Sequence, residues 1–406
     1  MSINNRNWHE SQPGKPLNTD LPAPAGSHKP YWRGRPKKEA NIGILTTSIR
    51  PGRPQKASKI LAELAFFIEL ARESPHNIYV FSPWGIDWHN RKVKAYRIVQ
   101  ADETSLEWEA YQAPMPDAVY DQIYNRNEEY RYREIRSQLK KITGGRYFNA
   151  RYLNKNEVHA LLRKTPGFER CLPETVRFRS IKELRSMMAK HEIIYLKPIG
   201  GSLGLGIMRA GYNREMRCYY VQSRRGRIRS ADSIESLFKI IRPLMKDQHY
   251  LLQQGIALLR QDGRIVDFRV LLQKNSRGDW SITKQYARVG AEKSITSNLA
   301  GGGTAYPVET VLTEAFSEPE IERIRNELKE LAYRTAETIE ETSGELFGEF
   351  GIDLGVDVKG KIWLIEVNSK PRRRTEGKGN ENLIVQSFLK PLRYAGYLAG
   401  KEQVER

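Results

Sequence analysis

A glycine-rich loop between two strands constrains the fold of this chain more than any other feature of the sequence. The apolar segment Glu192–Lys197 has the pattern of a strand and continues directly into the loop Pro198–Gly206. Residues 206–212 then favour another strand where a nucleotide-binding helix would otherwise begin. The loop is therefore not a Walker A loop, which requires a following Gly-Lys-Ser/Thr, and not a Rossmann fingerprint, which opens a helix.

The glycines of this loop are suited to binding phosphate. Glycine accepts unusual φ angles and has no Cβ, so the backbone N–H groups of such a loop can approach phosphate oxygens closely. Taken alone, a loop of this kind is more often a simple hairpin turn. Lys197 favours phosphate binding, because an ammonium at the end of an apolar strand needs an anion or water as its partner. A lysine whose head group reaches solvent is the alternative.

Two strands near the end of the chain carry oxygen ligands. We expect strands at Ile352–Val358 and Ile362–Val367, paired antiparallel. Alternation places Glu366 and Asn368 on one face, with Asp353 opposite them on the preceding strand. Two carboxylates and an amide oxygen suit Mg²⁺, which prefers hard oxygen ligands. Solvated strand-end side chains are the alternative, although the apolar neighbours of Glu366 predict that its strand is buried.

A third candidate group consists of Asp267, Arg269 and Arg288, on strands expected at 267–273 and 280–288. Asp267 and Arg269 share a face because they are two residues apart. They are explained equally well as an ordinary ion pair or as a nucleotide site. In the second case Asp267 binds a ribose, and either arginine binds a phosphate or an acyl group.

Periodicity and composition predict an α/β chain with a flexible leader at 1–40 and an N-terminal α/β domain at 41–150. The order strand–helix–strand within 41–82 predicts a parallel sheet in the N-terminal domain.

Composition limits the partners of the chain. The net charge of +19 favours anionic partners, but no nucleic-acid-binding motif accompanies it. We therefore expect ATP, and an acidic partner, rather than specific nucleic acid. No apolar run approaches the length of a membrane span, and no secretory signal opens the chain, which predicts a cytoplasmic location. Cys171 and Cys218 are expected to be inert thiols.

Taken in order, these motifs resemble the ATP-grasp superfamily, from about Lys155 to Pro371, which is more than half of the chain. The strings Gly351-Ile-Asp-Leu-Gly-Val-Asp357 and Ile362-Trp363 look like those of its YheC/YheD-type branch, the endospore coat-associated proteins. The resemblance implies an ATP-grasp fold with an N-terminal pre-ATP-grasp domain, and ATP and Mg²⁺ as cofactors. It implies a small lobe with the glycine-rich lid at 151–255, and a large lobe with the metal site and a C-terminal helix at 256–406. It also implies a spore-forming bacterium, with the spore coat as a second expected location.

The resemblance also implies roles for individual residues. The ATP phosphates are expected to contact Lys155, Lys197 and the lid residues Gly200, Gly201, Ser202 and Gly204. The adenine pocket is expected at Gln253, Gln254 and Ile256, and the ribose at Asp267. Magnesium is expected at Asp353, Glu366 and Asn368. The transferred phosphoryl group is expected to face Arg288, Asn298 and Arg269.

The activity implied by the resemblance is ADP-forming ligation of a carboxylate to an amine through an acylphosphate. The acid and the amine are not identified. A kinase, and a coat-assembly protein that keeps the fold without catalysis, are the alternatives. Two departures from the family pattern stand out: Gln253-Gln254 replaces an acidic hinge residue, and Pro371-Arg372 replaces Pro-Gly. The basic run Arg372–Arg374 suggests an acidic acceptor, such as an acidic peptide or a spore-coat component.

Overall fold

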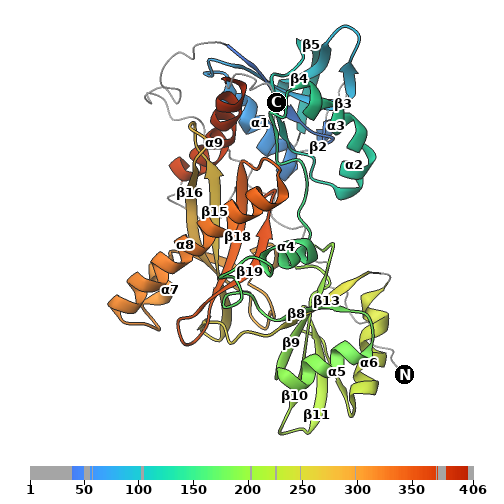
Figure 1. The fold of residues 1–406 in the computed structure, drawn as a ribbon, viewed down its shortest axis with the longest axis vertical. Coiled ribbons are helices and arrows are strands. Elements are labelled where there is room, and N and C mark those ends of the chain that lie inside the picture. The colour runs from blue at the N-terminus through green and yellow to red at the C-terminus, as the bar shows by residue number, and fades with distance from the viewer. Residues whose placement is uncertain are drawn as a thin grey trace, which may run out of the picture.

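The computed structural model describes residues 39–49, 55–56, 58–101, 105–201, 204–224, 226–246, 248–297, 299–371, 373 and 381–400. These residues form three sheets, and the third lies between the other two (Figure 1). The predicted leader falls outside the described residues except for its last two positions. No helix of the described part is both long and apolar enough to cross a membrane. Cys171 and Cys218 are buried free thiols.

The first sheet has seven strands, in the spatial order β2 (Gln55–Lys56), β5 (Ser105–Pro114), β4 (Lys92–Ala101), β3 (Asn77–Asp87), β1 (Asn41–Leu45), β6 (Ala118–Asp121) and β7 (Tyr147–Phe148). Its helices are α1 (Lys59–Ala71), α2 (Arg126–Arg131) and α3 (Arg133–Ile142). The predicted parallel unit is confirmed, because β1 pairs in parallel with both β3 and β6. An antiparallel β4–β5 pair, which the sequence did not predict, extends the sheet. These strands are hard to recognise because few of their side chains, such as Trp108, are buried.

The second sheet is antiparallel and carries the glycine-rich loop. Its six strands run in the order β12 (Ile228–Ala231), β11 (Cys218–Ser223), β10 (Met208–Asn213), β9 (Ile193–Pro198), β13 (Tyr250–Gln254) and β8 (Thr175–Phe178). Helices α5 (Ile181–Lys190) and α6 (Ile234–Met245) pack on it and against each other. The predicted capping box of Ser180 and Glu183 opens α5. Because β9 pairs with β10, the loop between them joins adjacent antiparallel strands.

The third sheet contains most of the charged candidate residues. Its main path is β17 (Thr304–Tyr306), β16 (Trp280–Val289), β15 (Arg264–Lys274), β18 (Glu349–Val356) and β19 (Ile362–Asn368), with β14 (Arg260–Gln261) paired to β15. The surrounding helices are α4 (Lys155–Leu162), α7 (Val308–Leu312), α8 (Glu318–Ser343), and the short 3-10 turn Leu299–Gly301. The long helix α8 lies along β15, β16 and β18, burying one face of this sheet (Figure 1).

The last helix, α9 (Glu381–Gly400), returns the chain to the first sheet. Its buried residues Phe388, Leu389 and Leu392 share one apolar core with Phe66 and Phe67 of α1. In Figure 1 the red α9 lies beside the blue α1, and α9 also contacts β15 and β16. The two ends of the described chain are therefore packed together, which fixes the third sheet against the first.

Candidate active site

Charged side chains stand opposite one another on four neighbouring strands of the third sheet. Arg269 on β15 is in register with Asp353 on β18, and Asp267 with Arg288 on β16. Asp353 is in turn in register with Glu366 on β19, in the antiparallel pair that alternation predicted. The sheet thus brings together five candidate residues that lie up to 100 positions apart in the sequence.

These side chains form a buried ion-pair network. Arg288 donates two hydrogen bonds to Asp267, each of 2.6 Å, and its Nη2 lies 2.8 Å from Asp353 Oδ2. Arg269 also donates to both carboxylate oxygens of Asp353. Asp267 accepts a further hydrogen bond from the Ser297 hydroxyl. The simple pair of Asp267 with Arg269 that the sequence allowed is wrong, because each residue is engaged by a partner on another strand.

The network keeps Asp353 ionised. Burial alone would raise the pKa of its carboxyl, but the two guanidiniums of Arg269 and Arg288 hold that pKa below its usual value. Burial likewise opposes the charge of Arg288, yet Asp267 and Asp353 raise the pKa of this arginine well above normal. Both oxygens of Asp353 are therefore occupied by cations in this structure.

Two lysines approach the same charged face from outside the sheet. Asn154 caps α4 by accepting a hydrogen bond from the Glu157 N–H, which places Lys155 in the first turn of this helix. Lys155 Nζ lies 3.1 Å from Glu366 Oε1 and donates to the Gly201 carbonyl oxygen at 2.6 Å. Lys155 therefore links β19 of the third sheet to the glycine-rich loop of the second.

Lys197, at the end of β9, is the more deeply buried of the two lysines. Its ammonium donates to Gln253 Oε1 at 2.5 Å, and its side chain is 9% exposed. Burial, together with the neighbouring ammonium of Lys155, lowers its pKa to about 8 against the attraction of Glu366. The alternative of a lysine whose head reaches solvent is therefore wrong. A bound polyanion would stabilise the neighbouring ammonium groups of Lys155 and Lys197.

The glycine-rich loop packs closely against its surroundings. Gly206 has φ of +76°, and a Cβ there would lie 2.9 Å from Pro198 and 3.0 Å from the Tyr250 hydroxyl. Gly204 also has a positive φ. A Cβ at Gly200 would lie 3.2 Å from Arg126 of α2. Ser202, the remaining predicted lid residue, lies outside the described residues.

The polar side chains expected around adenine and ribose form hydrogen bonds with other residues of the protein. Gln253 donates to the Thr175 hydroxyl while it accepts from Lys197. Gln254 Oε1 accepts from the Glu174 N–H, and the backbone of β13 is itself paired on both sides, with β8 and with β9. Ile256 follows two residues after β13. Asp267 is 5% exposed, and its contact with a ribose stays a prediction, as does the role of Asn298, which lies outside the described residues.

The predicted metal ligands lie on two paired strands. The Glu366 side chain is 33% exposed, so the expectation of a buried carboxylate is wrong: β19 buries its apolar side chains and leaves Glu366 on the open face. Asn368 is in register with Gly351, and its Oδ1 accepts from the Lys370 N–H. Among the described residues there is no cluster of three His, Cys, Asp or Glu side chains. A metal here would need the amide of Asn368 as well as the two carboxylates.

The sequence did not reveal two buried cations just beyond β19. Lys370 is completely buried, and its Nζ lies 2.9 Å from Asp121 and 2.7 Å from Glu129, both in the N-terminal part of the chain. Arg373 is equally buried and pairs with Glu349. A detectable signal was Asp121, whose carboxylate falls within an apolar strand and so requires a buried cation.

Arg373 corrects one interpretation of the basic run. This arginine was expected to face an acidic substrate, but it is 1% exposed and donates to Glu349 and to the hydroxyls of Tyr120 and Tyr124. Its positive charge is therefore compensated by a carboxylate inside the protein. Arg372 and Arg374 lie outside the described residues.

Comparison with known proteins points to one family. A family model described as YheC/D like ATP-grasp matches residues 144–398. The endospore coat-associated protein YheD of Bacillus subtilis (strain 168) is 27% identical over 372 residues, which cover 89% of this chain and 79% of that protein. The endospore coat-associated protein YheC of the same strain is 22% identical over 347 residues, covering 84% and 94%.

Among solved structures, the crystal structure of D-cycloserine synthetase DcsG superposes with a TM-score of 0.51. The sequences are 10% identical, and the match covers 87% of this chain and 99% of the other. At that identity the likeness concerns the fold alone.

Proposed function

Because this chain belongs to the YheC/D-like ATP-grasp family, we propose that it is an ATP- and Mg²⁺-dependent carboxylate–amine ligase acting through an acylphosphate. Membership confirms the fold and the family branch that the sequence predicted. The observation that carries the proposed activity is the meeting of two lysines with the charged face of the third sheet. Lys197 lies within the electrostatic reach of Glu366, Asp353 and Asp267, and Lys155 bridges Glu366 to the lid.

This arrangement suits a nucleotide triphosphate. Lys155 and Lys197 crowd each other, and burial disfavours the charge of Lys197, so binding of phosphate oxygens would relieve both costs. The backbone of the glycine-rich loop supplies further N–H donors. Just beyond β13 of the second sheet, the base would contact the backbone at Ile256, because the N–H groups of Gln254 and Gly255 already donate to carbonyl oxygens of the protein.

Glu366 and Asn368 lie two residues apart on one face of β19. Their side-chain oxygens are ligands that suit Mg²⁺. Asp353 completes the set once one of its arginines releases an oxygen. Bound there, Mg²⁺ would neutralise charge on the phosphate oxygens. The arginine released from Asp353, Arg288 or Arg269, would then be available to the transferred phosphoryl group.

The reaction has two steps. A substrate carboxylate oxygen attacks the γ-phosphorus of ATP, the bond from that phosphorus to the bridging oxygen breaks, and ADP leaves. An amine nitrogen then attacks the acyl carbon, the bond to the phosphate oxygen breaks, and inorganic phosphate leaves while the amine proton passes to solvent. The chain contributes position and positive charge, which is how enzymes accelerate phosphoryl transfer.

A second candidate function is assembly of the spore coat without catalysis. Both curated relatives are named as endospore coat-associated, and Glu366 is already paired with a lysine where a metal would bind. In that case the chain acts in the spore coat, whereas the ligase would act in the cytoplasm or on coat components, including acidic peptides. A kinase would share the first step and lack the second.

One experiment separates these functions. Purified protein with Mg²⁺–ATP is incubated with a panel of amino acids and acidic peptides, with and without added amines, and ADP and products are followed by a coupled assay and mass spectrometry. ADP release that requires both acid and amine supports the ligase. A phosphorylated product formed without an amine identifies a kinase, and no turnover with any pair favours the assembly protein. Lys197→Ala, assayed in parallel, checks that any ADP comes from this site.

A further inference from the structure

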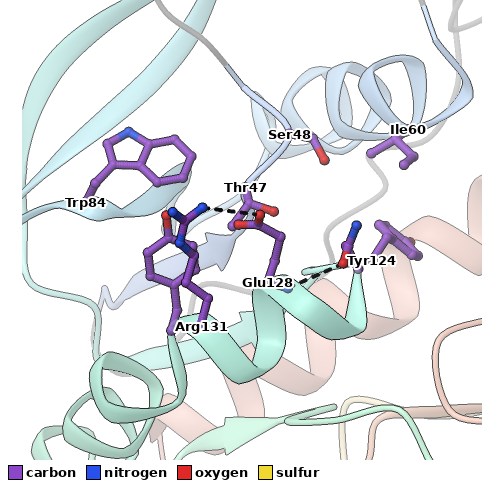
Figure 2. Close-up of a pocket in the computed structure, with 9 residues that line it drawn as sticks. Thr47, Ser48, Ile60, Trp84, Tyr124, Glu128 and Arg131 are labelled. Atoms are coloured by element: carbon purple, nitrogen blue, oxygen red, sulfur yellow. Dashed lines mark hydrogen bonds and ion pairs between the residues drawn. The ribbon is translucent and has the colours of Figure 1, made fainter.

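A crevice of about 590 Å³ opens where parallel strands of the first sheet end (Figure 2). It is lined by Thr47 and Ser48, which follow β1, and by Tyr124, which follows β6. Strand β1 lies between β3 and β6, so the chain leaves β1 on one side and later returns on the other. Ligands of open α/β sheets bind at such switch points, beyond the carboxyl ends of the strands.

The lining of the crevice is mixed, with aromatic and aliphatic side chains beside polar ones. Trp84, 48% exposed, and Tyr132 form one wall, with ring centroids 6.0 Å apart. Figure 2 shows Ile60 of α1 on the other side of the crevice from Trp84. A half-exposed tryptophan beside a tyrosine offers a large contact area to a ligand body at little entropic cost.

One charged pair lies in this crevice, whose lining also includes uncharged polar side chains such as Ser48 and Asn125. Glu128 and Arg131 are one turn apart on α2, and their charged groups lie 3.8 Å from each other, as the dashed line in Figure 2 marks. Their side chains are 29% and 69% exposed. An ion pair of this length and exposure contributes little to stability. Each side chain can therefore leave the other and pair with an oppositely charged group of a ligand. Two adjacent, opposite charges match a molecule with an ammonium and a carboxylate.

The crevice is connected to the nucleotide site on two sides. Arg126, two residues before Glu128, approaches Gly200 of the lid, where a Cβ would lie 3.2 Å from it. Tyr124 accepts a hydrogen bond from Arg373 at 3.2 Å, five residues beyond Asn368. A ligand in the crevice would therefore touch elements that also contact the lid and the end of β19.

We propose that this crevice binds the amine substrate as a zwitterionic amino acid or short peptide. Glu128 receives the ammonium, Arg131 the carboxylate, and Trp84 and Tyr132 the apolar body. This assignment rests on the proposed ligase function for its substrate role, but the binding itself requires no nucleotide.

The probes are L-amino acids and L-dipeptides, each with its N-acetylated and C-amidated counterpart. Binding to the full chain is measured by calorimetry without nucleotide, with tryptophan fluorescence as a second readout. We expect a zwitterionic probe to bind, and each blocked counterpart to lose about tenfold or more in affinity, which is the loss of one charge-assisted hydrogen bond. If no probe binds the parent protein, the proposal is wrong.

Variants locate the binding. Glu128→Gln, Arg131→Gln and Trp84→Ala should each weaken the zwitterionic probe about tenfold or more. Glu109→Gln, which breaks the exposed Arg97–Glu109 pair on β4 and β5, should not. Melting temperatures show that the variants fold, and the strongly exposed Arg131 is the safest position of the three. A probe that binds all variants equally would place its site elsewhere.

The two proposals fail in different ways. If a probe binds and the crevice variants weaken it, but no ADP is ever released, the crevice assignment holds and the ligase proposal fails. If an amine-dependent ligase reaction is found whose KM for the amine is unchanged in Glu128→Gln and Trp84→Ala, the ligase proposal holds and the crevice assignment is overturned.

Discussion

In the proposed nucleotide site, Lys197 would couple proton binding to nucleotide binding. Burial among Gln253 and the charges of Lys155, Glu366, Asp353 and Asp267 sets its pKa at about 8, from a usual 10.5. Phosphate binds the protonated form, so ATP should raise this pKa again. The lysine therefore titrates in a range that is easily reached by experiment.

We predict that ATP affinity falls as the pH rises above about 8. Loss of one proton from Lys197 limits the slope to about tenfold per pH unit. Calorimetry between pH 7 and pH 9.5 measures it. Lys197→Arg remains charged throughout and should give a flat profile. A slope of equal size in the arginine variant would show that another group titrates.

The same shift has an opposite effect on folding. The folded pKa of Lys197 lies below the unfolded value, so between about pH 8 and pH 10.5 the unfolded chain binds more protons. Stability should therefore rise with pH across this window, and the cost of burying the charge is present in full below it. Urea unfolding of Lys197→Met should show a smaller rise. Lys284 and Lys390, whose pKa values burial also lowers to about 8, account for a rise that persists.

Replacement of Lys197 tests the phosphate contact directly. A charge-assisted contact of this kind contributes about 1.5–3 kcal/mol, so Lys197→Ala should weaken ATP about tenfold to over a hundredfold. The variant should still fold, because burying the Lys197 ammonium is unfavourable in the absence of nucleotide. Normal ATP affinity in a folded Lys197→Ala protein would remove Lys197 from the nucleotide site.

Replacement of Glu366 distinguishes a ligase from an assembly protein without catalysis. Its side chain is one-third exposed and pairs with Lys155, and such pairs contribute at most about 1 kcal/mol. Glu366→Gln should therefore leave the melting temperature of the free protein nearly unchanged. In a ligase it should also abolish the stabilisation by Mg²⁺–ATP and stop ADP release. An unchanged Mg²⁺–ATP shift in this variant would exclude Glu366 as a metal ligand.

At the scale of elements, the end of β19 is held by the first sheet. Lys370 pairs with Asp121 and Glu129, while Arg373 pairs with Glu349 and contacts Glu63 at 3.6 Å. Both cations directly follow the strand that carries Glu366 and Asn368. Through Lys370, the position of the predicted metal ligands therefore depends on Asp121 and Glu129, which lie more than 200 residues away in the sequence.

We predict that Arg373→Met costs about 3–5 kcal/mol, because it leaves the Glu349 carboxylate buried without its cation. Urea unfolding measures the change. Arg97→Met, which breaks an exposed pair, should cost about 1 kcal/mol or less. Adding Glu349→Gln to Arg373→Met should recover part of the loss. Equal, small losses in the two arginine variants would mean that the network contributes little.

At the scale of the whole molecule, nucleotide binding must join two sheets. Lys197 belongs to the second sheet, whereas Glu366 and Asn368 belong to the third, and both groups act on the same phosphates in our proposal. Metal between the carboxylate face and the phosphates would remove the repulsion that otherwise opposes this approach.

We predict that ATP binds much more weakly without Mg²⁺ than with it. Calorimetry with Mg²⁺ and with a chelator provides the comparison, and Glu366→Gln should reduce the difference. Equal affinities in the parent protein would remove the metal assignment from Asp353, Glu366 and Asn368.

The sequence determined the elements that local pattern governs. Alternation placed Glu366 and Asn368 on one face, the capping pattern of Ser180 and Glu183 marked the start of α5, and the loop from Lys197 to Gly206 was expected between two strands. These features depend on residues within a few positions of each other, so their physical causes can be seen in the sequence. The order of the motifs along the chain was then sufficient to predict the family.

Only the tertiary structure decided which charges meet. That Asp267 pairs with Arg288 rather than Arg269, and that Arg373 is buried, follows from strand order and from the return of α9 to the first sheet. The crevice beside Trp84 likewise exists only because β1 lies between β3 and β6. Ion pairing and burial depend on distances between segments far apart in the chain, and no local pattern contains those distances.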